Sequence, residues 1–336
     1  MMIKLIHQLD SIRFPPHNNS THTLHPTLRE LMLKKKTPPS LNHLLTINCL
    51  TQNSIQLLID RAKELSTIKT PHIASHPNLP IITNLFFEPS TRTQYSFEIA
   101  AQRLLVPSIT PNIPSLSTLK GESLLDTIHN LEMMGSSLFI IRHSTNHTPE
   151  FIASELLTDA KVLNAGDGTH QHPSQCLIDL MTIQSQFTQF EQLSVAILGD
   201  THRSRVARSL TAGLQLMGTR DIRFITPPPL QTDLIEPPEG ITSMDIKQGL
   251  QGVDVIICLR VQQERIDSSS TPIDQATYFK HYGLTAEKLT WAKPHAIVMH
   301  PGPINRGFEI ESSVAEEINH SYYNRQKTAS QCAWPF

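Results

Sequence analysis

Cysteines and long apolar runs are both scarce in this sequence. The four cysteines, Cys49, Cys176, Cys258 and Cys332, are far apart and form no Cys-x-x-Cys pair. This spacing argues against a zinc knuckle and a disulfide framework, and reduced thiols fit a cytoplasmic protein. The longest apolar runs have only strand length, so we expect no transmembrane helix. The beginning of the chain also lacks the apolar stretch of a secretory signal.

An excess of charge of one sign is missing too, because the formal net charge is only -2. We therefore expect no nucleic-acid partner and no acidic solvating tail. The sequence has no Gly-x-Gly-x-x-Gly, which argues against a nicotinamide cofactor, and no Gly-x-Ser-x-Gly, which argues against a serine hydrolase. His170 and His172 form a His-x-His pair without acidic or further histidine partners, a weak metal signal. We expect neither a metal nor an organic cofactor.

Length and composition predict two packed domains, since the chain has 336 residues of which 39% are hydrophobic. Residues 1–40 differ from the rest in being rich in His, Pro, Thr and Asn, which predicts a flexible N-terminal extension. From Leu44 onward, apolar residues recur at helical spacing. This pattern predicts an opening helix that ends near Ser66.

Short apolar runs then alternate with stretches of helix length. Such runs are typical of strands buried on both faces, and strands separated by helices predict an α/β fold with parallel sheets flanked by helices. The amphipathic segment 173–187 is predicted to bridge two such units, which places the domains at 41–180 and 181–313. The predicted strands are 81–87, 137–142, 161–165, 194–199, 221–225, 253–259 and 296–299.

Residues 86–93, Phe-Phe-Glu-Pro-Ser-Thr-Arg-Thr, form the strongest chemical motif. They lie between a predicted strand and a helical pattern, and Pro89 suits a first helical turn because it has no N–H. Ser90, Thr91, Arg92 and Thr93 should therefore lie at a helix N-terminus, where backbone N–H groups and the helix dipole attract an anion. Hydroxyls and a guanidinium in the same turn favour phosphate. A simple N-cap would need only Ser90.

This motif resembles the carbamoyl phosphate signature of the aspartate/ornithine carbamoyltransferase family. The resemblance continues in order from about residue 44 to residue 313. It implies two α/β domains, one for carbamoyl phosphate and one for the amino-acid substrate. It further implies an active site in the interdomain cleft and a homotrimer with shared active sites. Glu88 matches the aspartate enzymes of the family, because the ornithine enzymes usually have lysine there.

Two further segments of the predicted first domain match family motifs. Residues 115–123 resemble a mobile loop that reaches into the neighbouring subunit's site. By this resemblance Lys120 bridges the phosphate and an aspartate carboxylate, and Ser117 is the matching serine, with Ser115 as the alternative if the loop length differs. Arg142 ends a predicted strand, where ligands collect in open α/β sheets. The resemblance assigns it to carbamoyl phosphate, and the alternative is an ordinary ion pair.

Two loops resemble the family's contacts to the carbamoyl group. Residues 172–175 match a His-Pro-x-Gln motif, in which His172 donates a hydrogen bond to the carbonyl oxygen and Gln175 holds the carbamoyl nitrogen. A helix N-terminus lowers a histidine pKa, and a neutral imidazole can still donate. Residues 300–303 match a His-Pro-x-Pro loop, in which the Gly302 carbonyl accepts hydrogen bonds from the amines.

Two arginine motifs resemble the family's aspartate site. Residues 199–205 fit the pattern Gly-Asp-x-x-x-Ser-Arg, in which Arg205 binds a carboxylate of aspartate. Residues 260–265 fit Arg-x-Gln-x-Glu-Arg, in which Arg260 clamps the side-chain carboxylate and Gln262 positions it. Ornithine enzymes have a different loop here, built for an amine.

The resemblance thus implies transfer of the carbamoyl group of carbamoyl phosphate to the α-amine of L-aspartate, a step of pyrimidine biosynthesis. Arg92, Thr93, Lys120 and His172 are the expected catalytic residues, acting by positioning and by stabilising the oxyanion. The alternatives are a carbamoyltransferase for another amino acceptor, or a non-catalytic homologue that assembles with a partner enzyme. The sequence does not decide whether regulatory or dihydroorotase chains bind.

The end of the chain departs from the family pattern. Family members end in a helix of the type Asn-Gly-Ile-Ala-Val-Arg-Met-Ala-Val, whereas residues 327–336 are Lys-Thr-Ala-Ser-Gln-Cys-Ala-Trp-Pro-Phe. One choice of codons for these residues, translated two bases later, gives the family ending. We therefore interpret residues 314–336 as an aberrant tail, caused by a frameshift that begins between Ala315 and His320, and as a poor substitute for a packed helix.

Overall fold

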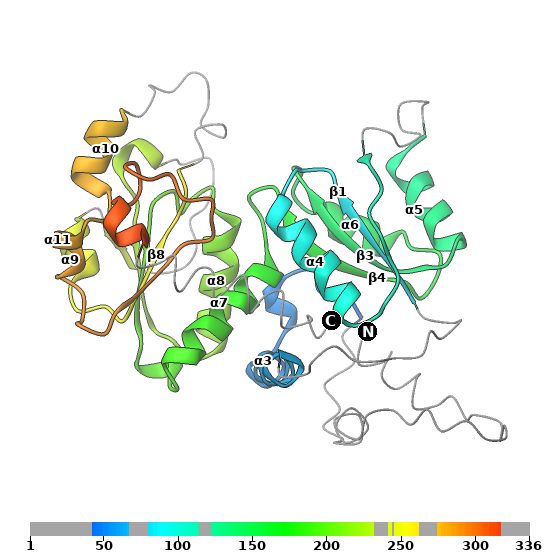
Figure 1. Cartoon of the computed structure of the whole chain (residues 1–336), viewed down its shortest axis with the longest axis horizontal. Helices are drawn as coiled ribbons and strands as arrows, with labels where there is room; N and C mark the ends of the chain where they lie inside the picture. The colour runs from blue at the N-terminus through cyan, green and yellow to red at the C-terminus, as the bar shows by residue number, and fades with distance from the viewer. Residues whose placement is uncertain are drawn as a thin grey trace. The chain divides into compact units, whose positions relative to one another are not determined.

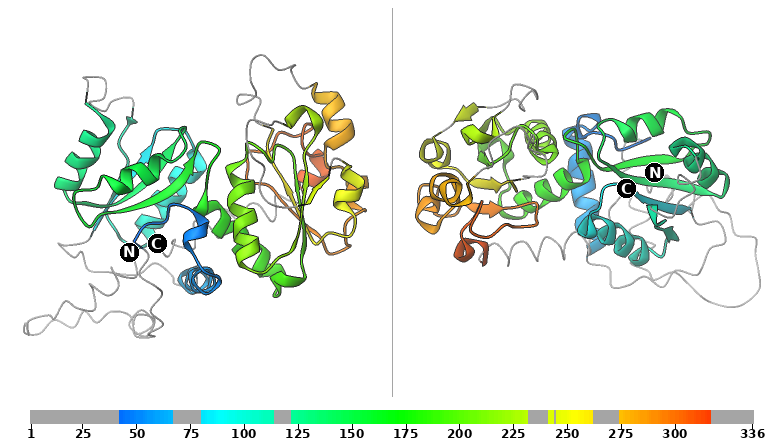
Figure 2. Two further views of the ribbon diagram at one scale, coloured as in Figure 1. Left: turned by 180° about the vertical axis from the view of Figure 1, so that it is seen from behind. Right: turned by 90° about the horizontal axis from the view of Figure 1, so that it is seen from above.

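The computed structural model describes residues 42–66, 80–113, 122–231, 241–243, 245–261 and 274–316. The chain divides into two compact units, one built mainly of Cys49–Asp167 and the other mainly of the residues from Gly168 onward (Figure 1). Each unit has its own parallel sheet and its own helices (Figure 2). The predicted N-terminal extension and almost all of the predicted tail lie outside the described residues and stay predictions.

The first unit has a four-stranded sheet in the order β2-β1-β3-β4, with every neighbouring pair parallel. Phe139 and Ile141 of β3 pack with Ile128 of α5 and Ile152 of α6, so these two helices cover the same face of the sheet. The strands are β1 (Ile81–Phe86), β2 (Ser108–Ile109), β3 (Ser136–His143) and β4 (Lys161–Asp167). The helices are α3 (Gln52–Ser66), α4 (Thr91–Arg103), α5 (Leu124–Met133) and α6 (Thr148–Ser154).

The second unit has a five-stranded parallel sheet in the order β7-β6-β5-β8-β9. Its core clusters around Ala196, Leu198, Ile256 and Cys258 of the central strands. The strands are β5 (Ser194–Leu198), β6 (Asp221–Ile225), β7 (Ile241–Ser243), β8 (Val255–Cys258) and β9 (Ile297–Met299). The helices are α7 (Pro173–Gln186), α8 (Arg205–Leu216), α9 (Ile246–Leu250), α10 (Gln275–Tyr282) and α11 (Ala286–Leu289). Among the helices described in both units, none has the length and apolar character that crossing a membrane requires.

Every strand predicted from an apolar run is present, and the α/β fold with two parallel sheets is confirmed. The opening helix is shorter than predicted, because it begins at Gln52 and not near Leu44. Leu44 is extended: its N–H donates to the Val162 carbonyl, and its own carbonyl accepts from the Asn164 N–H. The Thr51 hydroxyl then accepts the Ser54 N–H at 3.2 Å, which starts the helix.

Helices α7 and α8 of the second unit pack closely because α8 has a glycine at the contact. A Cβ atom at Gly213 would lie 2.4 Å from Cys176 Sγ and 3.0 Å from a methyl group of Leu180. The division into compact units falls after Asp167, ahead of α7. The domain limits 41–180 and 181–313 stay predictions.

Candidate active site

The N-terminus of α4 follows the end of β1 in the first unit. Ser90 is the N-cap residue, and Pro89 lies one residue before it, outside the first turn in which the sequence placed it. The Ser90 side chain caps no backbone N–H of this helix. Its hydroxyl instead donates to Thr93 Oγ1 at 3.0 Å. Two hydroxyls therefore lie together at a helix end that favours anions, which a simple N-cap does not explain.

Arg142 lies beside this helix end because β3 pairs with β1. Its Cα is the register partner of Phe86, and its carbonyl accepts the Phe87 N–H at 2.9 Å. The guanidinium forms an ion pair with Glu88 and donates to the Ala165 carbonyl at 3.2 Å. Both partners are largely buried, with side-chain exposures of 11% for Arg142 and 19% for Glu88. Arg142 thus forms the ion pair that the sequence allowed as its alternative role, with a residue shortly before the start of α4.

The exit from β4 is fixed by polar groups that the sequence did not single out. Asp167 is fully buried and accepts hydrogen bonds from Asn164 Nδ2 at 2.8 Å and from the His147 N–H at 2.7 Å. Asn164 Oδ1 in turn accepts the Gly166 N–H at 2.8 Å. Gly166 has a φ of 115°, a backbone conformation that strongly favours glycine. Apart from their position at the end of an apolar run, nothing in the sequence indicated a role for the Asn164 carboxamide or the Asp167 carboxylate.

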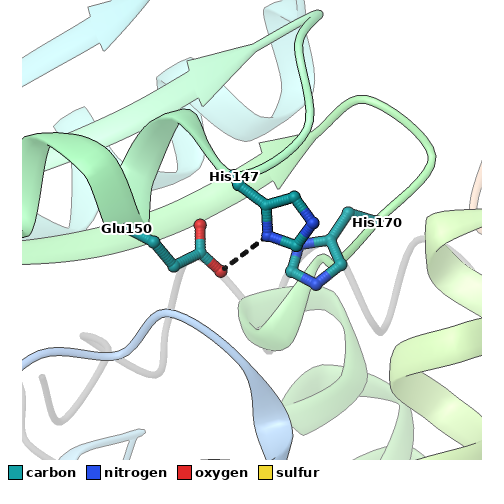
Figure 3. Close-up of side chains that lie close together, drawn as sticks. All are labelled: His147, Glu150 and His170. Atoms are coloured by element: carbon teal, nitrogen blue, oxygen red, sulfur yellow. Dashed lines mark ion pairs between the residues drawn. The ribbon is translucent and has the colours of Figure 1, made fainter.

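His147 of the first unit has its Nδ1 3.9 Å from Glu150 Oε1 (Figure 3). This spacing is that of two residues one helical turn apart, and Glu150 is half-buried. His170 is also drawn in Figure 3 and belongs to the second unit. We assign no metal site to these residues.

His172 is the N-cap residue of α7 in the second unit, and Pro173 occupies the first helical position. Its backbone N–H donates to Ser209 Oγ at 2.8 Å, and its Nδ1 lies 3.2 Å from Ser174 Oγ. Gln175 Nε2 donates to the buried Asp179 Oδ1 at 3.0 Å. His172 and Gln175 therefore have defined orientations at one helix end.

Arg205 is the first residue of α8 and is buried. Ser204 caps the helix, since its hydroxyl accepts the Ala207 N–H at 3.1 Å. Arg205 Nη1 donates to the Gly168 carbonyl at 3.1 Å, which joins α8 to the loop before α7. Earlier in the same turn, burial raises the pKa of Asp200 even though its Oδ1 accepts the Arg203 N–H. The β5–α8 turn is thus fixed by internal polar contacts.

The loops that bear Arg205 and Arg260 leave neighbouring strands, because β5 pairs with β8. A Cβ atom at Gly199 would lie 3.0 Å from the Leu259 carbonyl oxygen, and the φ of Gly199 is 120°. Glycine is therefore required where the two loops approach each other. Arg260 is half-buried and follows directly after Leu259.

Two buried residues, His300 and Glu309, form hydrogen bonds with the backbone of the loop after β9. His300 Nδ1 accepts the Gly302 N–H at 2.8 Å, so the proton of the neutral ring is on Nε2. That Nε2 lies 3.3 Å from Glu309 Oε1, which also accepts the Asn305 N–H. The sequence singled out Gly302 for its carbonyl but missed Glu309, which is nine positions from His300 and has no motif of its own.

The described residues thus form two groups. In the first unit, the Ser90–Thr93 turn lies beside Arg142. In the second unit, the turn containing His172 is joined to Arg205, and the Arg205 turn approaches the Arg260 loop. Ser115, Ser117, Lys120 and Gln262 lie outside the described residues, so their predicted roles stay predictions.

Two protein-family models match successive parts of this chain, one for each domain. Residues 42–185 match the family described as "Aspartate/ornithine carbamoyltransferase, carbamoyl-P binding domain", and residues 191–328 match "Aspartate/ornithine carbamoyltransferase, Asp/Orn binding domain". The aspartate carbamoyltransferase catalytic subunit of Coxiella burnetii is 47% identical over 276 residues, which cover 82% of this chain and 88% of that protein.

Solved structures are similar in fold. Aspartate transcarbamoylase from Trypanosoma cruzi in complex with carbamoyl phosphate and aspartate has a TM-score of 0.73 at 25% identity, covering 87% of this chain and 94% of that one. The catalytic subunit of M. jannaschii aspartate transcarbamoylase has a TM-score of 0.70 at 25% identity, covering 88% and 96%. With both domain families matched in order over most of its length, the chain belongs to the aspartate/ornithine carbamoyltransferase family.

Proposed function

We propose that this chain is the catalytic polypeptide of an aspartate carbamoyltransferase. It transfers the carbamoyl group of carbamoyl phosphate to the α-amine of L-aspartate and releases phosphate and N-carbamoyl-L-aspartate. The observation that carries the proposal is the α4 N-terminus, where the Ser90 and Thr93 hydroxyls lie close to each other and Ser90 follows the register partner of Arg142 by four residues. The Coxiella relative is named for this enzyme, and the Trypanosoma enzyme was solved with both substrates.

Carbamoyl phosphate is proposed to bind first, with its phosphate at the Ser90–Thr93 helix end. The backbone N–H groups of this turn, the hydroxyls and the guanidinium groups of Arg92 and Arg142 supply donors and positive charge. His172 donates to the carbonyl oxygen. Gln175 and the Gly302 carbonyl hold the carbamoyl nitrogen.

Aspartate is proposed to bind through cations of the second unit. Arg205 binds one carboxylate, and Arg260 clamps the other with Gln262 beside it. The two loops that bear these arginines are already close, because Gly199 approaches Leu259. Lys120 and Ser117 of a neighbouring subunit complete the site, which requires a homotrimer with shared active sites.

The reaction needs no side-chain nucleophile. The neutral α-amine attacks the carbonyl carbon, so that a C–N bond forms and the C–O bond to phosphate breaks. The leaving phosphate takes up the proton that the amine loses. Arg92, Thr93 and His172 stabilise the oxyanion that develops, and the remaining contribution is positioning of the two substrates. In the cell this step would belong to pyrimidine biosynthesis in the cytoplasm.

The test is formation of carbamoyl-aspartate by the purified chain, with ornithine as the parallel acceptor. We expect product with aspartate alone. The variant Arg92→Ala should lose about a hundredfold or more in kcat, whereas Arg103→Ala, the same change at the other end of α4, should retain activity. An Arg92→Ala enzyme with normal turnover would contradict the mechanism. A folded trimer without product would favour a non-catalytic homologue.

The ending of the tail, residues 327–336, is proposed to result from a frameshift that begins between Ala315 and His320 in the coding sequence. What supports this is the family ending that appears when one choice of codons is translated two bases later. Sequencing the coding DNA across residues 315–336 tests it. Codons that cannot give the family ending in any shifted frame would reject it.

A further inference from the structure

His172 lies in a buried polar cluster in which Ser174 of α7 contacts its ring and Ser209 of α8 contacts its backbone N–H. His172, Ser174 and Ser209 have exposures of 6%, 2% and 0%. Ser174 is the second residue of α7, and Ser209 lies within α8. Ser174 occupies the variable position of the His-Pro-x-Gln motif, and Ser209 belongs to no motif used above. Both contacts are within the second unit.

The Ser209 hydroxyl fixes the backbone that precedes α7. It accepts the His172 N–H at 2.8 Å and donates its own proton to Gln171 Oε1 at 2.6 Å. Arg205, one helical turn earlier on α8, donates to the Gly168 carbonyl at 3.1 Å. Helix α8 therefore holds the loop before α7 at two points, which leaves the His172 ring to be fixed by its own contacts.

The contact between His172 Nδ1 and Ser174 Oγ, at 3.2 Å, allows two arrangements. Either the serine O–H donates to Nδ1 and the ring proton is on Nε2, or Nδ1–H donates to the serine. Nδ1 lies beside the first turn of α7, where the backbone N–H groups carry partial positive charge. A lone pair on Nδ1 is favoured over an N–H in that field.

We propose that Ser174 is a positioning residue that donates to His172 Nδ1 and so keeps the ring neutral with its proton on Nε2. The contacts from which the tautomer is inferred lie within the second unit. Its consequence for catalysis rests on the proposed function, because Nε2–H then is the donor to the carbamoyl oxygen. Ser174 acts through His172 and contacts no substrate itself.

Nitrogen-15 NMR of the full chain, labelled at histidine, reports the tautomer without any need for activity. The His172 signals are assigned by their loss in His172→Gln. We expect Nε2 protonated and Nδ1 unprotonated at neutral pH. Ser174→Ala should shift the ring toward a mixture of tautomers, while Ser174→Thr, which keeps the hydroxyl, should restore the original signals. Protonated Nδ1 in the unmodified chain, or unchanged signals in Ser174→Ala, would overturn the inference.

Kinetics separate this inference from the proposed function. Ser174→Ala should lower kcat about tenfold or less, the equivalent of one neutral hydrogen bond, with the KM for aspartate unchanged. Ser174→Thr should recover the rate. Ser185→Ala, which removes an exposed hydroxyl of the same helix, should have no effect. If the unmodified chain makes no product, the proposed function fails while NMR still decides the tautomer. If His172→Gln loses activity and Ser174→Ala does not, the inference alone fails.

Discussion

Single buried residues fix the loops that leave the strands of both sheets. Asp167 holds the exit from β4, and His300 with Glu309 holds the loop after β9. Each of these polar groups is removed from water. Its hydrogen bonds offset the free-energy cost of that burial. The backbone positions that the proposed site needs therefore depend on residues that contact no substrate.

Removing the Glu309 carboxylate should destabilise the second unit. Glu309→Ala leaves the Asn305 N–H without its acceptor and His300 without its neighbour. We expect a loss of about 1–3 kcal/mol in the free energy of unfolding. Glu309→Gln retains an acceptor oxygen and should lose less. Denaturant unfolding of the three proteins measures both effects, and equal losses in the two variants would show that the hydrogen bonds are not the cause.

Asp254 should make the stability of the fold depend on pH. Its carboxylate accepts hydrogen bonds from the Ser194 N–H and from Lys293 Nζ, and it lies 3.0 Å from His295 Nε2. Although burial raises the pKa of Asp254, the Lys293 ammonium and these hydrogen bonds together hold it below its ordinary value. This group therefore stabilises the fold above its unfolded pKa, and the stabilisation is lost as pH falls through the folded pKa.

The measurement is thermal or denaturant unfolding of Asp254→Asn from neutral to acid pH. At neutral pH we expect a loss of about 1–3 kcal/mol, and at pH values below the folded pKa the variant and the original chain should converge. Asp159→Asn, the same change at an exposed site, controls for net charge. A constant difference across the range would mean that ionisation of Asp254 is not the cause.

At the scale of elements, α4, α7 and α8 all begin shortly after a strand ends, and each starts at a residue that the proposed function uses. This arrangement follows from parallel sheets, whose strands all end at the same edge. The helices must also lie close to their neighbours for these starts to be held in place. The contact of α7 with α8 is one example, because it depends on Gly213.

Gly213→Ala should loosen that contact. The added Cβ would lie 2.4 Å from Cys176 Sγ, so one helix must shift, at a cost of about 1–3 kcal/mol. Cys176→Ala removes the sulfur, and the double variant should be more stable than the sum of the two single changes predicts. A double-mutant cycle by denaturant unfolding checks this coupling, and strict additivity would place the strain elsewhere.

Strands with an apolar run could be predicted from the sequence, including the three-residue β9, whereas strands without such a run could not. Strand β3 was evident because its eight residues include a run of buried apolar side chains, whereas β2 and β7 have two and three residues and are set by pairing with β1 and β6. Motif residues such as Arg142 and His172 were found because their neighbours in sequence identify them. Ser209 was not, since its partner His172 is 37 positions away.

At the scale of the whole molecule, the proposed site needs residues of both compact units. Ser90, Thr93 and Arg142 belong to the first, and Arg205 and Arg260 belong to the second. A ligand that contacts both should stabilise the chain more than a ligand that contacts one, because each contact is made only by the folded protein.

A compound that joins a phosphonate to aspartate should bind more tightly than phosphate or aspartate alone, and should therefore raise the Tm more at equal ligand concentration. Arg142→Ala should weaken binding of phosphate with little effect on aspartate, and Arg260→Ala should do the reverse. Calorimetric titration and thermal shift measure these differences. Equal effects of the joined and separate ligands would argue against one site with contributions from both units.

The close approach of Gly199 to Leu259 sets the spacing between the turn that bears Arg205 and the loop that bears Arg260. Main-chain atoms determine this spacing, so it does not change when side chains in the loop 260–265 are replaced. A relative with substitutions in that loop alone could therefore bind a different amino acceptor, while the backbone spacing set by Gly199 and Leu259 stays the same. Gly199 itself cannot be replaced without a shift of this spacing, because its φ of 120° and the nearby Leu259 carbonyl leave no place for a Cβ atom.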